Sequence, residues 1–322
     1  MGKTLYLVNS GRVQRKENTL CIENKNGKFY FPIENIEQIN VLAEIDINTK
    51  LLEFLAKKGI IINFFDYYGN YYGTFSPKEQ LIAGEVIIKQ VEHYLDKEKR
   101  IFLARQFIKG AVKNLFINLK YYKINISLDE YLNKIENGKE IFELMSYEGN
   151  FRKQYYDLLD EHILKEPFKI ITRTRQPPTN YMNALISFGN SLLYATTIKE
   201  IFYTQLHPSI SFLHEPFYRR YSLALDISEI FKPIIVDRII FKLINKKMID
   251  ESFFEKSLNG ILLNEKGRKL FISEYESKLK STIFHKKLKR NVSYKQLIRI
   301  ECYKLIKHLI GMETYDPFVM WW

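Results

Sequence analysis

Cysteine is scarce in this sequence. Only Cys21 and Cys302 occur among the 322 residues, and both stand in apolar surroundings. Two cysteines this far apart supply neither a disulfide framework nor the clustered ligands of a structural zinc site. Their scarcity excludes a small disulfide-stabilised scaffold and is typical of a protein from a reducing compartment.

Long apolar runs are missing as well. The sequence has no run of about 18 apolar residues, the length at which a membrane helix is expected. The amino terminus lacks the apolar segment of a signal peptide. We therefore expect no membrane span and a cytoplasmic location. No internal repeat or low-complexity tract occurs either.

Acidic residues are outnumbered by basic ones. The chain has 37 Asp and Glu against 49 Lys and Arg, which gives a net charge of +12 at pH 7 and a pI near 9.3. A surplus of this size indicates a polyanionic partner, with nucleic acid favoured over a membrane surface. The alternative is that the charge serves solubility alone or reflects a coding bias towards lysine.

The first 76 residues carry strand signals and one helix signal. Asn26-Gly27 lies between two apolar segments and predicts a tight hairpin turn. Asn48 or Thr49 can cap a helix that ends at Gly59. The strands are expected at residues 4–8, 19–23, 28–32, 36–41, 60–65 and 71–75. The pattern predicts a small, mostly-β domain over residues 1–76 with no catalytic residue.

Ser76-Pro77 marks a change of composition, after which helical periodicity dominates. Residues 97–116 place basic side chains among apolar ones at helical spacing, which suits either a phosphate-tracking surface or the solvated side of an amphipathic helix. Ser293 can cap a last helix. We predict an α+β chain, with the mostly-β domain 1–76 followed by a larger all-α domain over residues 77–322.

Residues 205–237 collect the best candidates for chemistry. Asp226 and Glu229 are three apart, so they share one face of a helix, and His214 precedes them at the end of an apolar run. Carboxylates and an imidazole on one edge of a buried helix suit a divalent cation that accepts O and N donors. The alternative is a structural histidine, with the carboxylates paired to Arg219 or Arg220. His214-Glu215-Pro216 is not the HExxH motif of zinc peptidases.

Two further segments contain candidate contacts to nucleic acid. Arg173 and Arg175 stand on a loop stiffened by Pro177-Pro178, a suitable place for phosphate contacts, although structural loop arginines are as good an explanation. A compact basic cluster near the carboxyl terminus is the best local candidate for binding phosphates. It consists of Lys286, Lys287, Lys289 and Arg290.

Three ordered segments resemble the motifs of the CRISPR-associated adaptation integrases, the family called CRISPR-associated protein one. They read SYEGNFRKQYYD at 146–157, RTRQPPTNYMNALISFGNSLLY at 173–194 and FLHEPFYRRYSLALDISEIFKPIIVDR at 212–238. Their order and separation, together with the amino-terminal strands, extend the resemblance over nearly the whole chain. The resemblance turns Glu148, which spacing alone would not single out, into a third metal ligand.

The resemblance implies an enzyme. Glu148, His214 and Glu229 would hold Mg²⁺ or Mn²⁺ and carry catalysis, with Asp226 as an accessory acid. The activity would be a metal-dependent DNA endonuclease and integrase, in which a DNA 3′-OH attacks phosphodiesters of the CRISPR repeat to insert a short foreign spacer.

The resemblance also implies partners. These would be double-stranded DNA and branched intermediates, a second copy bound through the β domain, and the small CRISPR-associated protein two. Two alternatives stay open: a non-catalytic basic DNA-binding scaffold, which needs only the charge surplus, and a metal-dependent ribonuclease.

Overall fold

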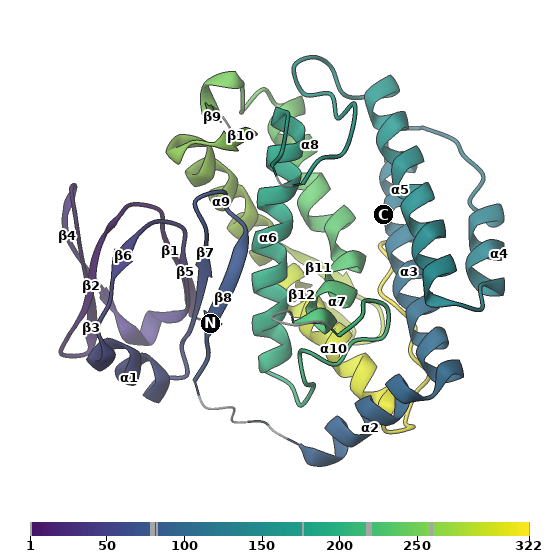
Figure 1. Cartoon of the computed structure of the whole chain (residues 1–322), viewed down its shortest axis with the longest axis horizontal. Helices are drawn as coiled ribbons and strands as arrows, with labels where there is room; N and C mark the ends of the chain where they lie inside the picture. Colours follow the sequence, from purple (N-terminus) through teal and green to yellow (C-terminus); the bar gives the residue numbers. More distant parts are fainter. Residues whose placement is uncertain are drawn as a thin grey trace. The chain divides into compact units, whose positions relative to one another are not determined.

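The structure is a computed structural model that describes residues 2–77, 81, 83–175, 177–216, 221–257 and 260–321. The chain divides into two compact units, Met1–Gln80 and Leu81–Trp322. Figure 1 colours both along the sequence. The α+β class expected from the sequence is confirmed.

The amino-terminal unit contains two four-stranded sheets. One has the order β1-β5-β7-β8, in which β8 alone is antiparallel to its neighbour, and the other has the order β4-β3-β2-β6. A short 3₁₀ turn, Ile33–Asn35, precedes β5. The bounds are β1 Lys3–Leu7, β2 Gly11–Lys16, β3 Thr19–Asn24, β4 Gly27–Pro32, β5 Ile36–Val41, β6 Ile45–Asp46, α1 Thr49–Lys57, β7 Ile61–Phe65 and β8 Tyr71–Phe75.

Local signals explain two of these elements. The β3–β4 hairpin turns where expected, with Gly27 at a φ of +120° that side chains rarely adopt. Helix α1 begins at the predicted cap, because the Asn48 side chain accepts a hydrogen bond from the Leu51 N–H at 2.9 Å. Strands β2 and β6 were not expected from the sequence.

The second unit is mainly helical rather than wholly helical, which corrects the all-α expectation for residues 77–322. Two antiparallel hairpins, β9–β10 and β11–β12, lie among the helices. Its helices are α2 Gly84–Leu95, α3 Lys97–Tyr121, α4 Asp129–Asn137, α5 Ile141–His162, α6 Tyr181–Phe202, α7 Ser222–Lys232, α8 Arg238–Asn245, α9 Glu265–Lys280 and α10 Tyr294–Leu309. A π-helical turn, Pro233–Asp237, joins α7 to α8, and a 3₁₀ turn, Glu251–Phe253, precedes β9. The hairpin strands are β9 Phe254–Ser257, β10 Gly260–Leu263, β11 Thr282–His285 and β12 Arg290–Ser293.

Helix α6 forms the centre of this unit. It packs against α7 and α10, while α3 packs against both α5 and α7 (Figure 1). Helix α6 packs closely at Gly189, where a methyl group would lie 2.5 Å from Cγ1 of Val236 and 2.8 Å from Cζ of Phe271. The four helices α3, α5, α6 and α7 therefore form one packed core.

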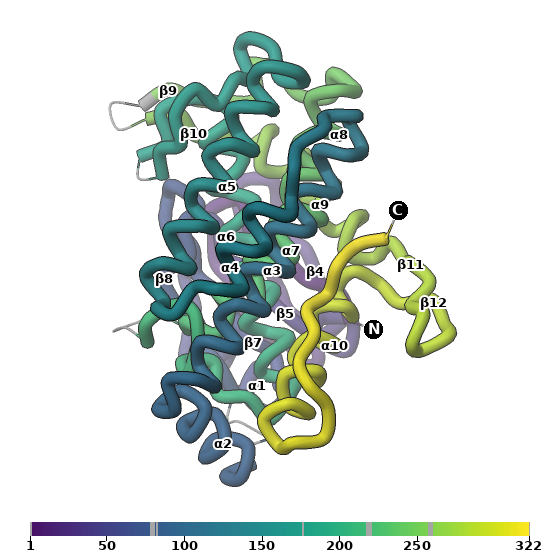
Figure 2. Tube along the Cα trace, turned by 90° about the vertical axis from the view of Figure 1, so that its right-hand side faces the viewer, coloured from purple at the N-terminus to yellow at the C-terminus, as the bar shows by residue number. Residues whose placement is uncertain are grey.

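The carboxyl-terminal segment folds back onto its own unit. The predicted cap Ser293 forms a capping box with Gln296 at the start of α10. Beyond α10 the chain turns back along this unit (Figure 2). Phe318 and Met320 are buried there, and the backbone at both residues bonds to the Asn114 side chain of α3. No helix in the described part of the chain combines the length and apolarity needed to cross a membrane.

Packing at Gly189 makes a stability prediction. Ala is the better helix former, yet Gly189→Ala should lower the free energy of unfolding by about 1–3 kcal/mol because the new methyl group overpacks the core. The matched control is Gly149→Ala in α5, where the methyl group would meet nothing within 4 Å. That control should stabilise the protein slightly. Urea unfolding followed by far-UV circular dichroism measures both, and equal midpoints for the two variants would contradict the close packing.

Candidate active site

Asp226 organises the segment that carries His214. This fully buried carboxylate accepts backbone N–H bonds from Phe212 at 2.7 Å, Leu213 at 3.0 Å and His214 at 3.0 Å. It also contacts Nδ1 of the His214 ring at 2.8 Å. Both oxygens of Asp226 are thus occupied within the protein, which makes this residue the anchor of the segment.

Neighbouring helices hold the same segment from the other side. Gln90 of α2 donates to the carbonyls of His207 and Ile210, both at 3.2 Å. Arg100 of α3 donates to the carbonyl of Phe212 at 3.0 Å and to Glu215 at 2.6 Å. A stretch without regular secondary structure is therefore fixed at several points, and the imidazole has a defined position.

The hydrogen bond to Asp226 also sets the chemistry of the imidazole. A carboxylate accepts from Nδ1–H, so Nε2 is the nitrogen left with a lone pair for a ligand. Burial would lower the pKa of His214, but the hydrogen bond to Asp226, its charge and that of Glu229 raise it above the ordinary value. A quarter of the His214 side chain is exposed, so the ring is reachable.

Arg152 brings Glu148 and Glu229 together. Its Nη2 contacts Oε1 of Glu148 at 2.5 Å and Oε2 of Glu229 at 2.7 Å. Glu148 and Arg152 lie one turn apart on α5, whereas Glu229 comes from α7. Two carboxylates on one guanidinium nitrogen lie side by side, so residues 81 positions apart in the sequence share one location.

A second cation faces Glu229. Lys232, one turn further along α7, contacts Oε1 of Glu229 at 2.5 Å. Burial would raise the pKa of Glu229, but Lys232, Arg152 and His214 lower it to about 2. Glu229 is therefore ionised throughout the neutral range. The alternative that it pairs with Arg219 or Arg220 lies outside the described residues.

The sequence did not single out Asp237, which lies next to these groups. Tyr155 donates to Oδ2 of Asp237 at 3.0 Å, and Asn118 donates to the Tyr155 hydroxyl at 3.2 Å. Burial raises the pKa of Asp237 to about 6, against the opposing charge of Arg152. No sequence signal marks this network, because its members come from α3, α5 and the π-helical turn.

The structure separates the expected phosphate-binding residues into two kinds. Arg173 is held against α6 by bonds to Asn183 and Ser187, each at 3.1 Å, whereas Arg175 is exposed. The cluster Lys286, Lys287, Lys289 and Arg290 lies at the tip of the β11–β12 hairpin, where all four side chains are exposed. This hairpin protrudes at the edge of Figure 2.

Three basic residues of α3 serve the fold. Arg105 donates to the carbonyl of Gly138 at 2.7 Å, Lys109 pairs with Glu136, and Arg100 holds the His214 segment. Each is already used by an acceptor within the protein, which favours the structural interpretation over a phosphate-tracking surface.

The chemical types of the candidate donors, carboxylate oxygens and an imidazole nitrogen, suit a divalent cation. Glu148 and Glu229 offer carboxylate oxygens that already contact cationic groups, and His214 offers Nε2. Such a set suits Mg²⁺ or, because of the imidazole, Mn²⁺. Within the described ranges, no three His, Cys, Asp or Glu side chains are grouped closely enough to hold an ion as they stand. In this arrangement Arg152 and Lys232 occupy the carboxylates.

Comparison with known proteins identifies the family. The family model described as "CRISPR associated protein Cas1" matches residues 5–277. The chain is 51% identical over 320 residues to a CRISPR-associated protein Cas1 of Methanobrevibacter ruminantium, with 99% of each chain covered. It is 48% identical over 319 residues to the CRISPR-associated endonuclease Cas1 of Pyrococcus horikoshii, again with 99% of each covered.

Solved structures agree. A Cas1 protein from Thermotoga maritima superposes with a TM-score of 0.91 at 44% identity, covering 98% of this chain and 100% of the other. More distant structures share the fold. A Cas6-RT-Cas1–Cas2 complex has a TM-score of 0.84 at 17% identity, with 100% of this chain and 36% of that chain covered. A TtCas1–DNA complex has a TM-score of 0.51 at 12% identity, with 95% and 96% covered.

These comparisons confirm the resemblance seen in the three sequence blocks. They also confirm the predicted enzyme class, a CRISPR-associated endonuclease and integrase of spacer acquisition. The chain belongs to the CRISPR-associated protein Cas1 family.

Proposed function

We propose that Glu148, His214 and Glu229 carry the chemistry of this Cas1 endonuclease and integrase. The observation that supports this most is the shared contact of Glu148 and Glu229 with Nη2 of Arg152. Side chains from α5 and α7 meet there, and the charge of Glu229 acts on the neighbouring His214. Residues 77–322 would accordingly form the catalytic domain.

These three residues would hold Mg²⁺ or Mn²⁺. A bound divalent ion would lower the pKa of a water or a DNA 3′-OH and stabilise charge on the attacked phosphate. Glu229, with its pKa of about 2, supplies an ionised carboxylate at neutral pH. His214 supplies Nε2, and Asp226 keeps that nitrogen oriented by binding Nδ1. Asp226 thus acts as an accessory acid that positions the imidazole.

Arg152 and Lys232 have a related role. They neutralise the two carboxylates and hold them in place, as buried anions require a partner. If the carboxylates held a divalent cation, the guanidinium and the ammonium group would be free to contact a DNA phosphate. Arg152 suits that purpose because its planar fork matches phosphate geometry.

DNA is the proposed substrate, as duplex, branched intermediate and CRISPR repeat. The charge of +12 and the exposed cations at Arg175 and on the β11–β12 hairpin support it. A fold relative is described as a Cas1–DNA complex. The nucleophile would distinguish the two outcomes: attack by water cuts a strand, and attack by a 3′-OH joins two.

The amino-terminal unit is proposed to bind protein partners. Its edge strand β4 exposes Phe29 by 43% and Tyr30 by 50%, and exposed aromatic residues on a sheet edge are typical of interfaces. We assign residues 1–76 to a homodimer contact, with CRISPR-associated protein two as a further partner. A distant relative occurs in a complex described as Cas1–Cas2, which supports the second partner.

The proposed ligands make a direct prediction. Glu148→Gln, His214→Ala and Glu229→Gln should each lower Mn²⁺-dependent strand transfer into a CRISPR-repeat plasmid by more than about 100-fold, since even residues that merely orient metal ligands are worth about 10–100-fold. DNA affinity should stay within a factor of about two. EDTA should abolish wild-type activity, and Mn²⁺ should restore it.

Two further variants serve as comparisons. Glu161→Gln removes an exposed carboxylate from the same helix α5 and should behave as wild type. Asp226→Asn should weaken Mn²⁺ binding by about 10–100-fold, as expected for a group that orients a ligand. Titration calorimetry with Mn²⁺ measures this binding directly and does not depend on strand-transfer activity. Normal strand transfer by the His214 variant would refute the assignment.

The hairpin cluster makes a prediction about salt. Replacing Lys286, Lys287 and Arg290 by Gln, and Lys289 by Asn because its φ is +49°, should weaken DNA binding. The slope of log affinity against log salt should fall by about 0.9 for each lost phosphate contact. The control removes four lysines that each face a carboxylate, Lys97, Lys99, Lys134 and Lys269. If both variants keep the wild-type slope, the hairpin does not contact DNA.

The dimer prediction uses strand β4. The intact chain should sediment as a dimer, and Phe29→Ser with Tyr30→Ser should shift it to a monomer because the apolar contact area is lost. Ile88→Ser, which changes a residue of α2 that is 60% exposed, is the control. Wild-type protein that sediments as a monomer at micromolar concentration would contradict the dimer.

A further inference from the structure

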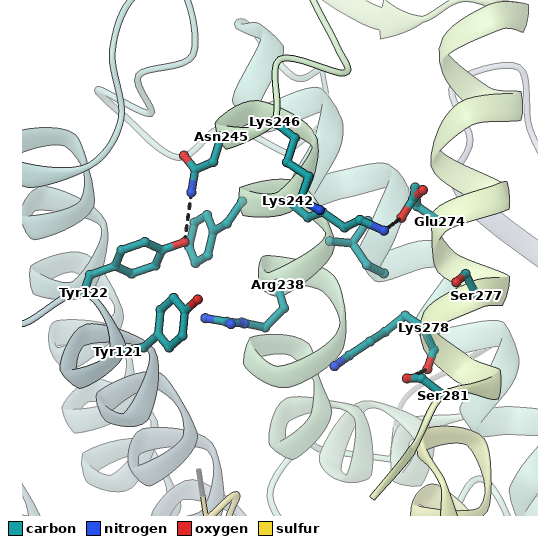
Figure 3. A pocket seen from close by; sticks show the side chains of 12 residues that line it. Tyr121, Tyr122, Arg238, Lys242, Asn245, Lys246, Glu274, Ser277, Lys278 and Ser281 are labelled. Carbon is teal, nitrogen blue, oxygen red and sulfur yellow. Dashed lines mark hydrogen bonds and ion pairs between the residues drawn. The ribbon is translucent and has the colours of Figure 1, made fainter.

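A cavity of about 480 Å³ opens between α3, α8 and α9. Figure 3 shows Arg238 and Lys278 extending into it, with Tyr121 at the end of α3 beneath the Arg238 guanidinium. We call it the α8–α9 pocket. None of Glu148, His214 and Glu229 lines it.

Positive charge dominates this pocket. Four of its lining residues are basic: Arg238, Lys242, Lys246 and Lys278. Glu274 is the one acidic side chain among the lining residues that the structure describes, and it already pairs with Lys242. Basic side chains therefore outnumber acidic ones by four to one among the described lining residues.

Arg238 and Lys278 repel each other. The guanidinium of Arg238 stacks on the Tyr121 ring at 3.9 Å, and the ammonium of Lys278 lies 3.6 Å from the Tyr294 ring centroid. Burial and the charge of Arg238 lower the pKa of Lys278 to about 8. Each of these two cations lies against a different aromatic ring, and Glu274 is the sole carboxylate among the described lining residues, so the pocket favours an anion.

The basic hairpin begins at the rim of this pocket. Ser281 lines the pocket, and β11 starts at the next residue. At the other end of the hairpin the Tyr294 N–H bonds to the Ser281 carbonyl at 3.1 Å. Both ends of the hairpin are therefore anchored beside Lys278, so the hairpin that carries the exposed cations starts at the pocket.

We propose that the α8–α9 pocket binds the phosphate of a nucleotide, chiefly one within a nucleic-acid strand that continues along the β11–β12 hairpin. Arg238 and Lys278 would hold the phosphate, while Lys242 and Lys246 at the mouth attract it. The volume lies in the range of about 300–1,000 Å³ that small-molecule sites occupy, so a nucleotide unit can enter. This site is separate from the metal-dependent chemistry.

The test uses Lys278→Met, which keeps the length of the side chain and removes its charge. Binding of a labelled single-stranded oligodeoxynucleotide to the intact chain is measured by fluorescence anisotropy in EDTA at several salt concentrations. Affinity should fall about tenfold, as for a lost hydrogen bond to a charged group. The salt slope should fall by about 0.7, the value for one contact to a single strand. EDTA makes the result independent of the proposed metal ligands.

The matched control is Lys280→Met on the same helix, whose exposed side chain faces Glu276 at 3.3 Å. It should bind as wild type. The melting temperature of Lys278→Met without ligand should equal or exceed that of wild type, because a repulsion is relieved. A second experiment measures the melting temperature with ATP or pyrophosphate. If the pocket binds free nucleotides, each ligand should raise the melting temperature of wild type but not that of Lys278→Met. Wild-type behaviour of Lys278→Met towards all three ligands would overturn the proposal.

Discussion

A positive charge between two carboxylates is the interaction on which the site depends. Arg152 contacts both Glu148 and Glu229, and each of these side chains is at least four-fifths buried. Carboxylates this close repel each other unless a cation lies between them, and removing one partner of a buried ion pair costs about 3–5 kcal/mol. The guanidinium thus fixes α5 against α7.

The position of the imidazole depends on a different constraint. His214 lies outside any helix or strand, so no regular backbone ladder fixes it. Asp226 takes the place of those backbone hydrogen bonds by accepting bonds from three consecutive N–H groups. Gln90 of α2 and Arg100 of α3 bind carbonyls of the same segment. A buried carboxylate without these donors would be costly, so the segment and the charge stabilise each other. The segment is therefore anchored to the helices around it.

The sequence predicted the hairpin β3–β4, helix α1 and its cap, because these depend on neighbouring residues. It missed β2, whose residues GRVQRK show little alternation and bury Val13 alone. It pointed to Glu148, His214 and Glu229 through two of the three motifs, but not to their contacts. Lys232 follows Glu229 by three residues, a spacing that could have been noticed. Asp237 and the α8–α9 pocket arise where distant helices meet, which no local pattern reports.

Contacts within the protein distinguish basic residues that stabilise the fold from those that form clusters of positive charge. Along α3, Arg100, Arg105 and Lys109 each meet an acceptor supplied by the fold, so their charge is used to hold segments together. On the β11–β12 hairpin and in the α8–α9 pocket, the described cations outnumber the carboxylates beside them. Like charges held close repel each other, and a bound polyanion would relieve that repulsion. The places where cations outnumber carboxylates, rather than the total of +12, are therefore the places at which we propose that nucleic acid binds.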